Sequence, residues 1–284
     1  MLFLLLLLIG ACRQVEKSIP EVLPISEAVF AEEVQIPSDT MQQSFGAYVL
    51  LPDCYRQDST RHFPVVYLLH GYSGKYSNWY EKMPTLQDYA SQHEIIIVNP
   101  DGQFGSWYID SPMDTSWRFE TYIAKEVPEW IDTHYRTVPL PEGRAITGLS
   151  MGGHGALYLG LNHQDFFGAA GSMSGGVDLK PFPNNWDLQQ RIGTQQEHPE
   201  NWTKYSVVDQ LDLLKPGKGP ALIIDCGVDD FFYAVNLDLH QKLLDRKIPH
   251  DFISRPGEHN WPYWENAVVY QLLFFNRYFA AGGF

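Results

Sequence analysis

Short apolar runs alternate with helical stretches along most of this 284-residue chain. The apolar runs have the length and composition of buried parallel strands and cover residues 65–69, 95–98, 145–147, 169–173, 221–225 and 251–254. The helical stretches between them cover residues 85–92, 119–135, 151–161, 231–246 and 264–279. Strands that alternate with helices predict an α/β fold, in which a mostly parallel sheet carries helices on both faces.

Three other features of the sequence refine this prediction. Residues 28–36 and 45–51 alternate apolar and polar side chains, which predicts an antiparallel pair at the sheet edge. Pro128 falls inside the helical stretch 119–135 and predicts a kink or a break there. Residues 178–220 are rich in Pro, Asn, Gln and Trp without a clear period, so we expect an insertion over the sheet edge that could cap a site.

Composition excludes two classes of protein. The chain is 44% hydrophobic, which argues against a disordered protein. It carries 20 basic and 34 acidic residues, for a formal net charge of −14. A protein that binds nucleic-acid phosphates needs a basic surface, so we expect no nucleic-acid partner.

The N-terminus has the pattern of an export signal. Residues 1–9 read MLFLLLLLI, far shorter than the roughly 20 residues of a membrane-spanning helix, and fit the apolar core of a secretory signal. Residues 9–12, Ile-Gly-Ala-Cys, resemble a bacterial lipobox, in which the cysteine is lipidated and becomes the new N-terminus. We therefore expect a lipoprotein-type signal peptide at 1–11, a polar, proline-containing tether at 12–26 and a folded domain at 27–284.

An ordinary signal peptide with an incidental cysteine is the alternative, and the usual basic residues before the apolar run are missing. Both interpretations predict an exported protein, in a bacterial periplasm or at the outer membrane or cell surface. Membrane contact is expected only through a lipid on Cys12. We expect the other two cysteines, Cys54 and Cys226, to be free and mostly buried.

The strongest chemical signal is the segment GLSMG at residues 148–152, which follows a predicted strand and precedes a predicted helix. The serine has a glycine two residues before it and another two residues after it. Between a strand and a helix, this pattern predicts a nucleophile elbow. Small residues are needed there because the strained turn brings neighbouring backbone close. Ser150 is therefore the candidate nucleophile. A structural serine in a glycine-rich turn is the alternative.

A nucleophilic serine needs a base and a group that orients the base. In sheets of this kind the acid and then the histidine follow the serine in chain order. His259 lies in the loop after the strand 251–254, whereas His240 falls in a helical pattern and His250 precedes the strand. Asp229 and Asp230 both follow the strand 221–225, and the pattern alone does not choose between them. A histidine in a surface turn is the alternative role for His259.

Acyl transfer also needs donors for the developing oxyanion. They are expected from the residue after the nucleophile and from the loop after an earlier strand. Residues 65–69 lead into His70-Gly71-Tyr72. The backbone N–H groups of Tyr72 and Met151 are therefore the predicted donors, and His70 is predicted to order the loop.

Four segments together resemble one family. They read LLHGYSGKYSNW at 68–79, GLSMGGHGAL at 148–157, CGVDDFF at 226–232 and GEHNWPYW at 257–264. They resemble the esterase D type of α/β-hydrolases, which include feruloyl and acetyl-xylan esterases of carbohydrate esterase family one, S-formylglutathione hydrolases, enterochelin esterases and mycolyltransferases. The resemblance extends from about residue 28 to residue 279. Ser73 departs from it, since many members have a second glycine there, which suggests a slightly stiffer oxyanion loop.

The resemblance implies an α/β-hydrolase with Ser150, Asp230 and His259 as catalytic residues, Tyr72 and Met151 as oxyanion donors, and no metal or cofactor. Residues 105–112 resemble a family segment beside the pocket. Trp107 and Trp261 are therefore predicted to bind substrate, because aromatic faces stack on sugars and hydroxycinnamates, with burial in the core as the alternative.

The predicted activity is hydrolysis of small esters or of an acylated polysaccharide through an acyl-enzyme. Acetyl or feruloyl esters on plant polysaccharide are the first choice of substrate, since an exported site argues against S-formylglutathione. A siderophore trilactone esterase or another small-ester hydrolase is the alternative enzyme. A non-catalytic carbohydrate-binding lipoprotein is the alternative from a different class.

Overall fold

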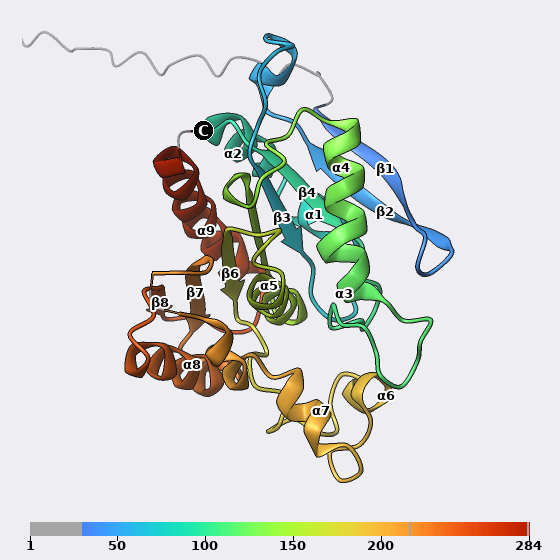
Figure 1. Cartoon of the computed structure of the whole chain (residues 1–284). Helices are drawn as coiled ribbons and strands as arrows, with labels where there is room; N and C mark the ends of the chain where they lie inside the picture. The colour runs from blue at the N-terminus through green and yellow to red at the C-terminus, as the bar shows by residue number, and fades with distance from the viewer. Residues whose placement is uncertain (1–29, 216, 283) are drawn as a thin grey trace, which may run out of the picture.

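An eight-stranded sheet forms the centre of the computed structural model, which describes residues 30–215, 217–282 and 284 (Figure 1). The strands are β1 (Ala31–Ser38), β2 (Gln43–Leu50), β3 (Val65–Leu69), β4 (Ile96–Pro100), β5 (Arg144–Gly148), β6 (Ala169–Met173), β7 (Ala221–Gly227) and β8 (Asp251–Arg255). Their order is β1-β2-β4-β3-β5-β6-β7-β8. β2 pairs antiparallel with β1 and with β4, and the other pairs are parallel. The predicted fold class, with its antiparallel N-terminal edge, is confirmed.

Helices cover both faces of this sheet. They are α1 (Asn78–Lys82), α2 (Leu86–His93), α3 (Phe119–Thr121), α4 (Val127–His134), α5 (Met151–Asn162), α6 (Leu188–Ile192), α7 (Pro199–Lys204), α8 (Tyr233–Asp245) and α9 (Trp261–Gly282). Side chains of α3, α4, α5 and α8 belong to one apolar core, and those of α1, α2 and α9 belong to a second. No helix among the described residues is long and apolar enough to cross a membrane.

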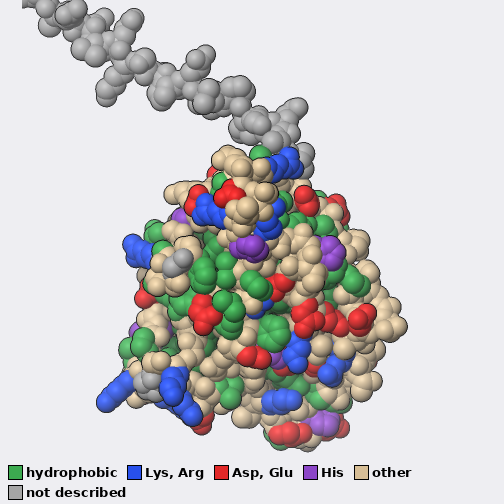
Figure 2. Space-filling view, turned by 45° about the horizontal axis from the view of Figure 1, so that its top comes forward, with side chains coloured by type: hydrophobic (Ala, Val, Ile, Leu, Met, Phe, Trp, Pro, Cys, Tyr) green, Lys and Arg blue, Asp and Glu red, His purple; other side chains and the backbone are tan. Residues whose placement is uncertain are grey.

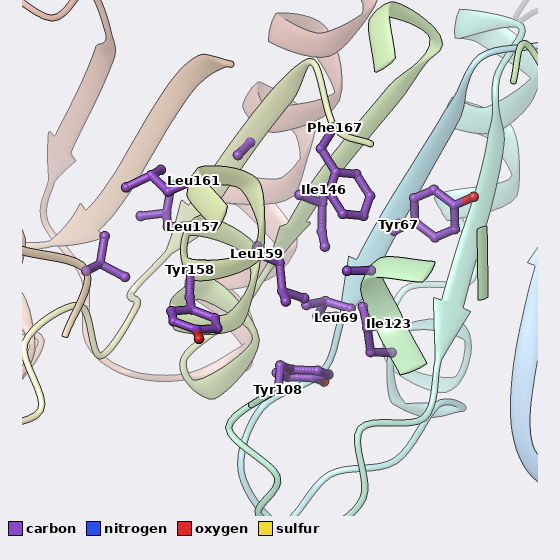
Figure 3. Packing of buried hydrophobic residues seen from close by; sticks show 14 of the residues in the cluster. Tyr67, Leu69, Tyr108, Ile123, Ile146, Leu157, Tyr158, Leu159, Leu161 and Phe167 are labelled. Carbon is purple, nitrogen blue, oxygen red and sulfur yellow. The ribbon is translucent and has the colours of Figure 1, made fainter. Parts of the chain in front are cut away.

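The central strands read as apolar runs because both of their faces are buried. In β3, Val65, Tyr67 and Leu69 pack in the first core, while Val66 and Leu68 pack in the second. This division follows from the two-residue period of side chains along a strand. Figure 3 shows the first core, where Leu69 and Ile146 of the sheet lie next to Leu159 of α5, and Tyr67 lies beside Phe167.

The helical stretch predicted at 119–135 is interrupted. A π-helical turn, Tyr122–Glu126, separates α3 from α4, and Pro128 lies in the first turn of α4. Proline has no N–H to donate to the preceding turn, which accounts for an irregular ladder at this point. The helix therefore continues from residue 119 to residue 134 with a π-helical turn just before Pro128, and the predicted kink or break takes the form of this local irregularity.

Residues 178–213 form the insertion and are called the cap below. The cap contains α6, α7 and two 3-10 turns, Val207–Asp209 and Leu211–Leu213. Figure 1 shows α6 and α7 beyond the carboxyl ends of the parallel strands. The cap therefore lies at the edge of the sheet where ligands are expected.

The predictions for the N-terminus fall outside this description, whereas those for Cys54 and Cys226 fall within it. The signal peptide, the tether and Cys12 lie outside the described residues. Cys54 is half-buried, Cys226 is buried, and both are free thiols. Figure 2 shows acidic and basic side chains interspersed over one face of the molecule.

Candidate active site

Ser150 lies in a sharp turn between β5 and α5. Its φ of 55° and ψ of −116° are strained for a residue with a side chain. Its N–H donates to the carbonyl of Met173 at 2.9 Å, which ties the turn to β6. A Cβ on Gly152 would lie 2.6 Å from the carbonyl oxygen of His70, so only glycine permits this approach. The turn therefore has the geometry expected of a nucleophile elbow.

His259 joins Ser150 to Asp230. Its Nε2 lies 2.9 Å from Ser150 Oγ, and its Nδ1 lies 2.8 Å from Asp230 Oδ2. The ionised carboxylate can only accept, so Nδ1 carries the proton and Nε2 is left to accept the hydroxyl proton of Ser150. Asp229 is exposed. The structure thus brings Asp230, and not its neighbour, to the histidine.

The loops that carry Asp230 and His259 are fastened to each other. The N–H groups of Val228 and Asp229 donate to the carbonyls of Arg255 and Gly257, both at 3.0 Å. The fully buried Asp225 forms an ion pair with Arg255. It also accepts a hydrogen bond from the hydroxyl of Tyr263 at 2.5 Å. Burial raises the pKa of Asp225 to about 6. These contacts connect the ends of β7 and β8 and fix the separation of the two loops.

Two backbone amides remain for an oxyanion. Within the described part of the chain, the N–H groups of Tyr72 and Met151 have no hydrogen-bond partner. Met151 is the first residue of α5, so its N–H is one of the free donors of a helix N-terminus, where negative charge is stabilised. The two amides thus have the donor capacity that the sequence analysis assigned to them.

His70 orders the loop that contains Tyr72. It is buried, its Nδ1–H donates to the carbonyl of Gly71 at 2.8 Å, and its Nε2 accepts the N–H of Gly102 at 2.8 Å. An accepting Nε2 carries no proton, so the ring is neutral. Ser73 has a φ of 60°, a conformation that glycine adopts freely. A glycine, which the resemblance leads one to expect here, would adopt this conformation without strain, whereas Ser73 adopts it at a cost of about 1 kcal/mol.

Ser150 and His259 open into a cavity of about 330 Å³, called the Ser150 cavity below. Its walls are Gly71, Tyr72, Ser73, Gly74, Asn78, Leu149, Trp186, Phe231, Trp261 and Trp264. Trp261, predicted to bind substrate, lines it. Trp107 does not line it and is buried, with 1% of its surface exposed.

The position of Trp107 corrects the expectation that its ring contacts substrate. Its φ is 53°, and its ring packs on His154 with 5.2 Å between centroids. Its Nε1–H donates to the carbonyl of Trp186 at 3.1 Å. Trp107 therefore supports a cavity residue rather than being one.

Two aromatic residues of the cavity wall, Phe231 and Trp186, were not predicted. The Phe231 ring lies 4.1 Å from the His259 ring and stacks on Trp186 at 5.7 Å, with 21° between the planes. Phe231 directly follows Asp230 in the sequence, so the motif that contains the acid could have indicated Phe231 as a cavity residue. Trp186 belongs to the cap, where no periodic pattern indicates which side chains turn inward.

A serine elbow on a mostly parallel sheet, with an acid and a histidine on loops after two later strands, defines an α/β-hydrolase. The model of the family described as "Putative esterase" matches residues 38–275, and the chain belongs to this family.

Known proteins resemble the chain to different extents. Esterase Rv1288 of Mycobacterium tuberculosis is 36% identical over 140 residues, which are 48% of this chain and only 30% of that protein's length. The acetyl esterase of Caldicellulosiruptor saccharolyticus is 27% identical over 227 residues, 72% of this chain and 80% of its own. The solved structure of a ferulic acid esterase has a TM-score of 0.72 and 28% identity, covering 87% of this chain and 98% of its own.

Proposed function

We propose that the protein hydrolyses carboxylic esters, with Ser150 as nucleophile, His259 as general base and Asp230 as the residue that orients and stabilises the histidine. One observation carries this proposal: the two ring nitrogens of His259 lie within hydrogen-bond distance of Ser150 Oγ and Asp230 Oδ2. Membership of the esterase family supports it.

The reaction follows from these positions. His259 Nε2 takes the Ser150 proton as Oγ attacks the ester carbonyl, and the N–H groups of Tyr72 and Met151 stabilise the tetrahedral oxyanion. The imidazolium gives its proton to the departing alcohol, which leaves an acyl-enzyme. Water then attacks the acyl carbon while His259 Nε2 takes a proton from it. The imidazolium returns this proton to Ser150 Oγ as the bond from Oγ to the acyl carbon breaks, which releases the carboxylic acid and restores Ser150.

Acetyl or feruloyl esters on plant polysaccharide are the proposed substrates. The Ser150 cavity has aromatic walls at Tyr72, Trp186, Phe231, Trp261 and Trp264, which suit flat rings and the apolar faces of sugars. The names of two relatives, an acetyl esterase and a ferulic acid esterase, support the same class.

The test of the activity and substrate is a panel of acetylated xylan, methyl ferulate, a siderophore trilactone and a chromogenic short-chain ester. We expect release of acetate or ferulate and hydrolysis of the chromogenic ester. Cleavage of the trilactone alone would replace the proposed substrate, and no cleavage of any ester would overturn the proposed activity.

We also propose that the enzyme is exported and anchored by a lipid on Cys12. The lipobox-like residues 9–12 support this. Stable anchoring needs more than one acyl chain, as bacterial lipoproteins carry. In a bacterial host, the wild type should fractionate with membranes and be extracted by detergent, and Cys12→Ser should release or misprocess it. A wild type wholly free in the periplasm would indicate an ordinary signal peptide.

A further inference from the structure

A second cavity, called the cap cavity below, is lined by residues on either side of Trp186, and Trp186 itself lines the Ser150 cavity. It measures about 250 Å³, the space of about eight water molecules and the size class of one monosaccharide. Amide side chains dominate its walls, which consist of Asn184, Asn185, Asp187, Leu188, Gln189 and Gln190. No lysine or arginine lines it, and its one charge is the Asp187 carboxylate. Its chemistry suits a neutral ligand that both donates and accepts hydrogen bonds.

The two cavities share one wall. Trp186 lines the Ser150 cavity, and its chain neighbours Asn185 and Asp187 line the cap cavity. Asp187 Oδ2 accepts a hydrogen bond from the hydroxyl of Tyr72 at 2.7 Å, and Tyr72 lines the Ser150 cavity. Trp186 and the hydrogen-bonded pair Tyr72 and Asp187 therefore connect the walls of the two cavities.

The shared wall is held in a strained conformation. Trp186 and Asp187 have φ of 51° and 56°, an unfavourable region for residues with side chains. The Trp107 indole bonds the Trp186 carbonyl at 3.1 Å, and Gln190 Nε2 bonds Asp187 Oδ1 at 3.1 Å. Strain of this kind persists where the surroundings enforce it, most often at ligand sites. Here it directs two successive side chains to two different cavities.

We propose that the cap cavity binds the sugar of the leaving group, while the acyl group occupies the aromatic Ser150 cavity. This inference rests on the proposed esterase function and adds the binding site for the alcohol side of the ester. The Asn185 amide has no side-chain hydrogen bond among the described residues, so its donors and acceptor are free for sugar hydroxyls. An anion would face the Asp187 carboxylate, and an apolar acyl group would leave the Asn185 amide without a partner.

The test uses esters that share an acyl group and differ in the alcohol. Methyl ferulate is compared with feruloylated arabinose, and ethyl acetate with an acetylated xylo-oligosaccharide. Both members of a pair form the same acyl-enzyme, so differences in kcat/KM arise before deacylation and report on the alcohol side. Asn185→Ala and Gln190→Ala should each lower the ratio of kcat/KM on the sugar ester to that on the simple ester about three- to tenfold, the effect of one hydrogen bond.

A bulky replacement and a control sharpen the comparison. Asn185→Trp fills the cap cavity and should lower the same ratio more than tenfold. Gln241→Ala removes an exposed amide on α8, away from both cavities, and should leave the ratio at its wild-type value. Equal losses on sugar and simple esters in the Asn185 variants would overturn the leaving-group site while the esterase function stands.

A binding measurement without turnover distinguishes failure of the proposed sugar site from failure of the proposed esterase function. In Ser150→Ala protein, calorimetry with the deacylated arabino- or xylo-oligosaccharide should detect binding that Asn185→Trp abolishes. Absence of binding, together with an unchanged ratio of kcat/KM, would overturn the inference. A wild type that hydrolyses no ester of either pair while still binding the oligosaccharide would overturn the proposed function and leave the sugar site.

Discussion

Asp230 contacts His259 with one carboxylate oxygen and the backbone with the other. Oδ2 lies 2.8 Å from His259 Nδ1, and Oδ1 accepts the N–H of Phe232 at 2.8 Å. The second bond fixes the carboxylate plane, so the first is aimed at the ring. Asp229, one residue earlier, is exposed and uses its N–H to hold the carbonyl of Gly257. Two adjacent carboxylates thus occupy different environments.

This difference predicts different effects of the two amide substitutions. Asp230→Asn should lower kcat by roughly 10⁴, because the amide no longer fixes the histidine tautomer or stabilises the imidazolium. Asp229→Asn, the matched control, should change kcat only a few-fold. Steady-state kinetics on a chromogenic ester measures both. A severe loss in Asp229→Asn with near-normal Asp230→Asn would contradict the assignment of the acid.

Removal of the nucleophile should have a similar effect. Ser150→Ala should lower kcat by about 10⁴ or more, since no other group forms the acyl-enzyme. His259→Ala should lose as much, because the two residues act as a unit. Thermal unfolding and circular dichroism should match the wild type. A folded Ser150→Ala protein with near-normal activity would be incompatible with the proposed mechanism.

The sheet and the residues around Ser150 were predictable for a physical reason. β3 and β6 are buried on both faces, so their sequences are apolar runs with the bounds observed. The elbow was predictable because close backbone approach restricts residues 148 and 152 to glycine. Short helices such as α1 and α6 were not, since tertiary packing rather than local propensity stabilises five-residue helices.

The orientation of individual side chains could not be predicted from the local sequence. Asp229 and Asp230 have the same chemistry, and only the three-dimensional position of His259 distinguishes them. Trp107 lies in the segment expected beside the pocket, but its backbone has a positive φ and its ring is buried against the cap residue Trp186. Trp186 reaches the cavity through the same kind of strained backbone. Left-handed conformations at bulky residues are imposed by tertiary contacts and leave no local pattern.

Trp186 should affect substrate binding more than the chemical step. It lines the Ser150 cavity without contacting the reacting groups through any hydrogen bond. Trp186→Ala should raise KM for aromatic esters about tenfold, from lost apolar and stacking contact, with a smaller change in kcat. Trp130→Ala removes an indole that stacks on His134 of α4 and serves as the control. A fall in kcat with unchanged KM would instead assign Trp186 a role in aligning the reacting groups.

His154 should make the folded protein less stable at low pH. The ring is fully buried in α5, its Nε2–H donates to the carbonyl of Tyr205 at 2.7 Å, and its Nδ1 has no hydrogen-bond partner among the described residues. Burial lowers the pKa of His154 to about 4 from its ordinary value of 6.5. The unfolded chain therefore binds the proton more tightly than the folded protein does.

The sign of the pH effect follows from this lowered pKa. The stabilisation is complete above about pH 6.5 and is lost as the pH falls towards 4, by about 3 kcal/mol over that range. Asp225 contributes to the pH dependence of stability with the opposite sign, because its raised pKa makes the folded protein bind a proton more tightly below about pH 6.

The wild type and a His154 variant both contain Asp225, so comparing the two proteins at each pH cancels the contribution of Asp225. His154→Gln keeps an N–H donor for Tyr205 and does not titrate, so its free energy of unfolding should fall about 2–3 kcal/mol less than that of the wild type between pH 7.5 and 4.5. Urea unfolding at the two pH values measures the difference. Equal losses in the two proteins would show that His154 does not cause the acid sensitivity.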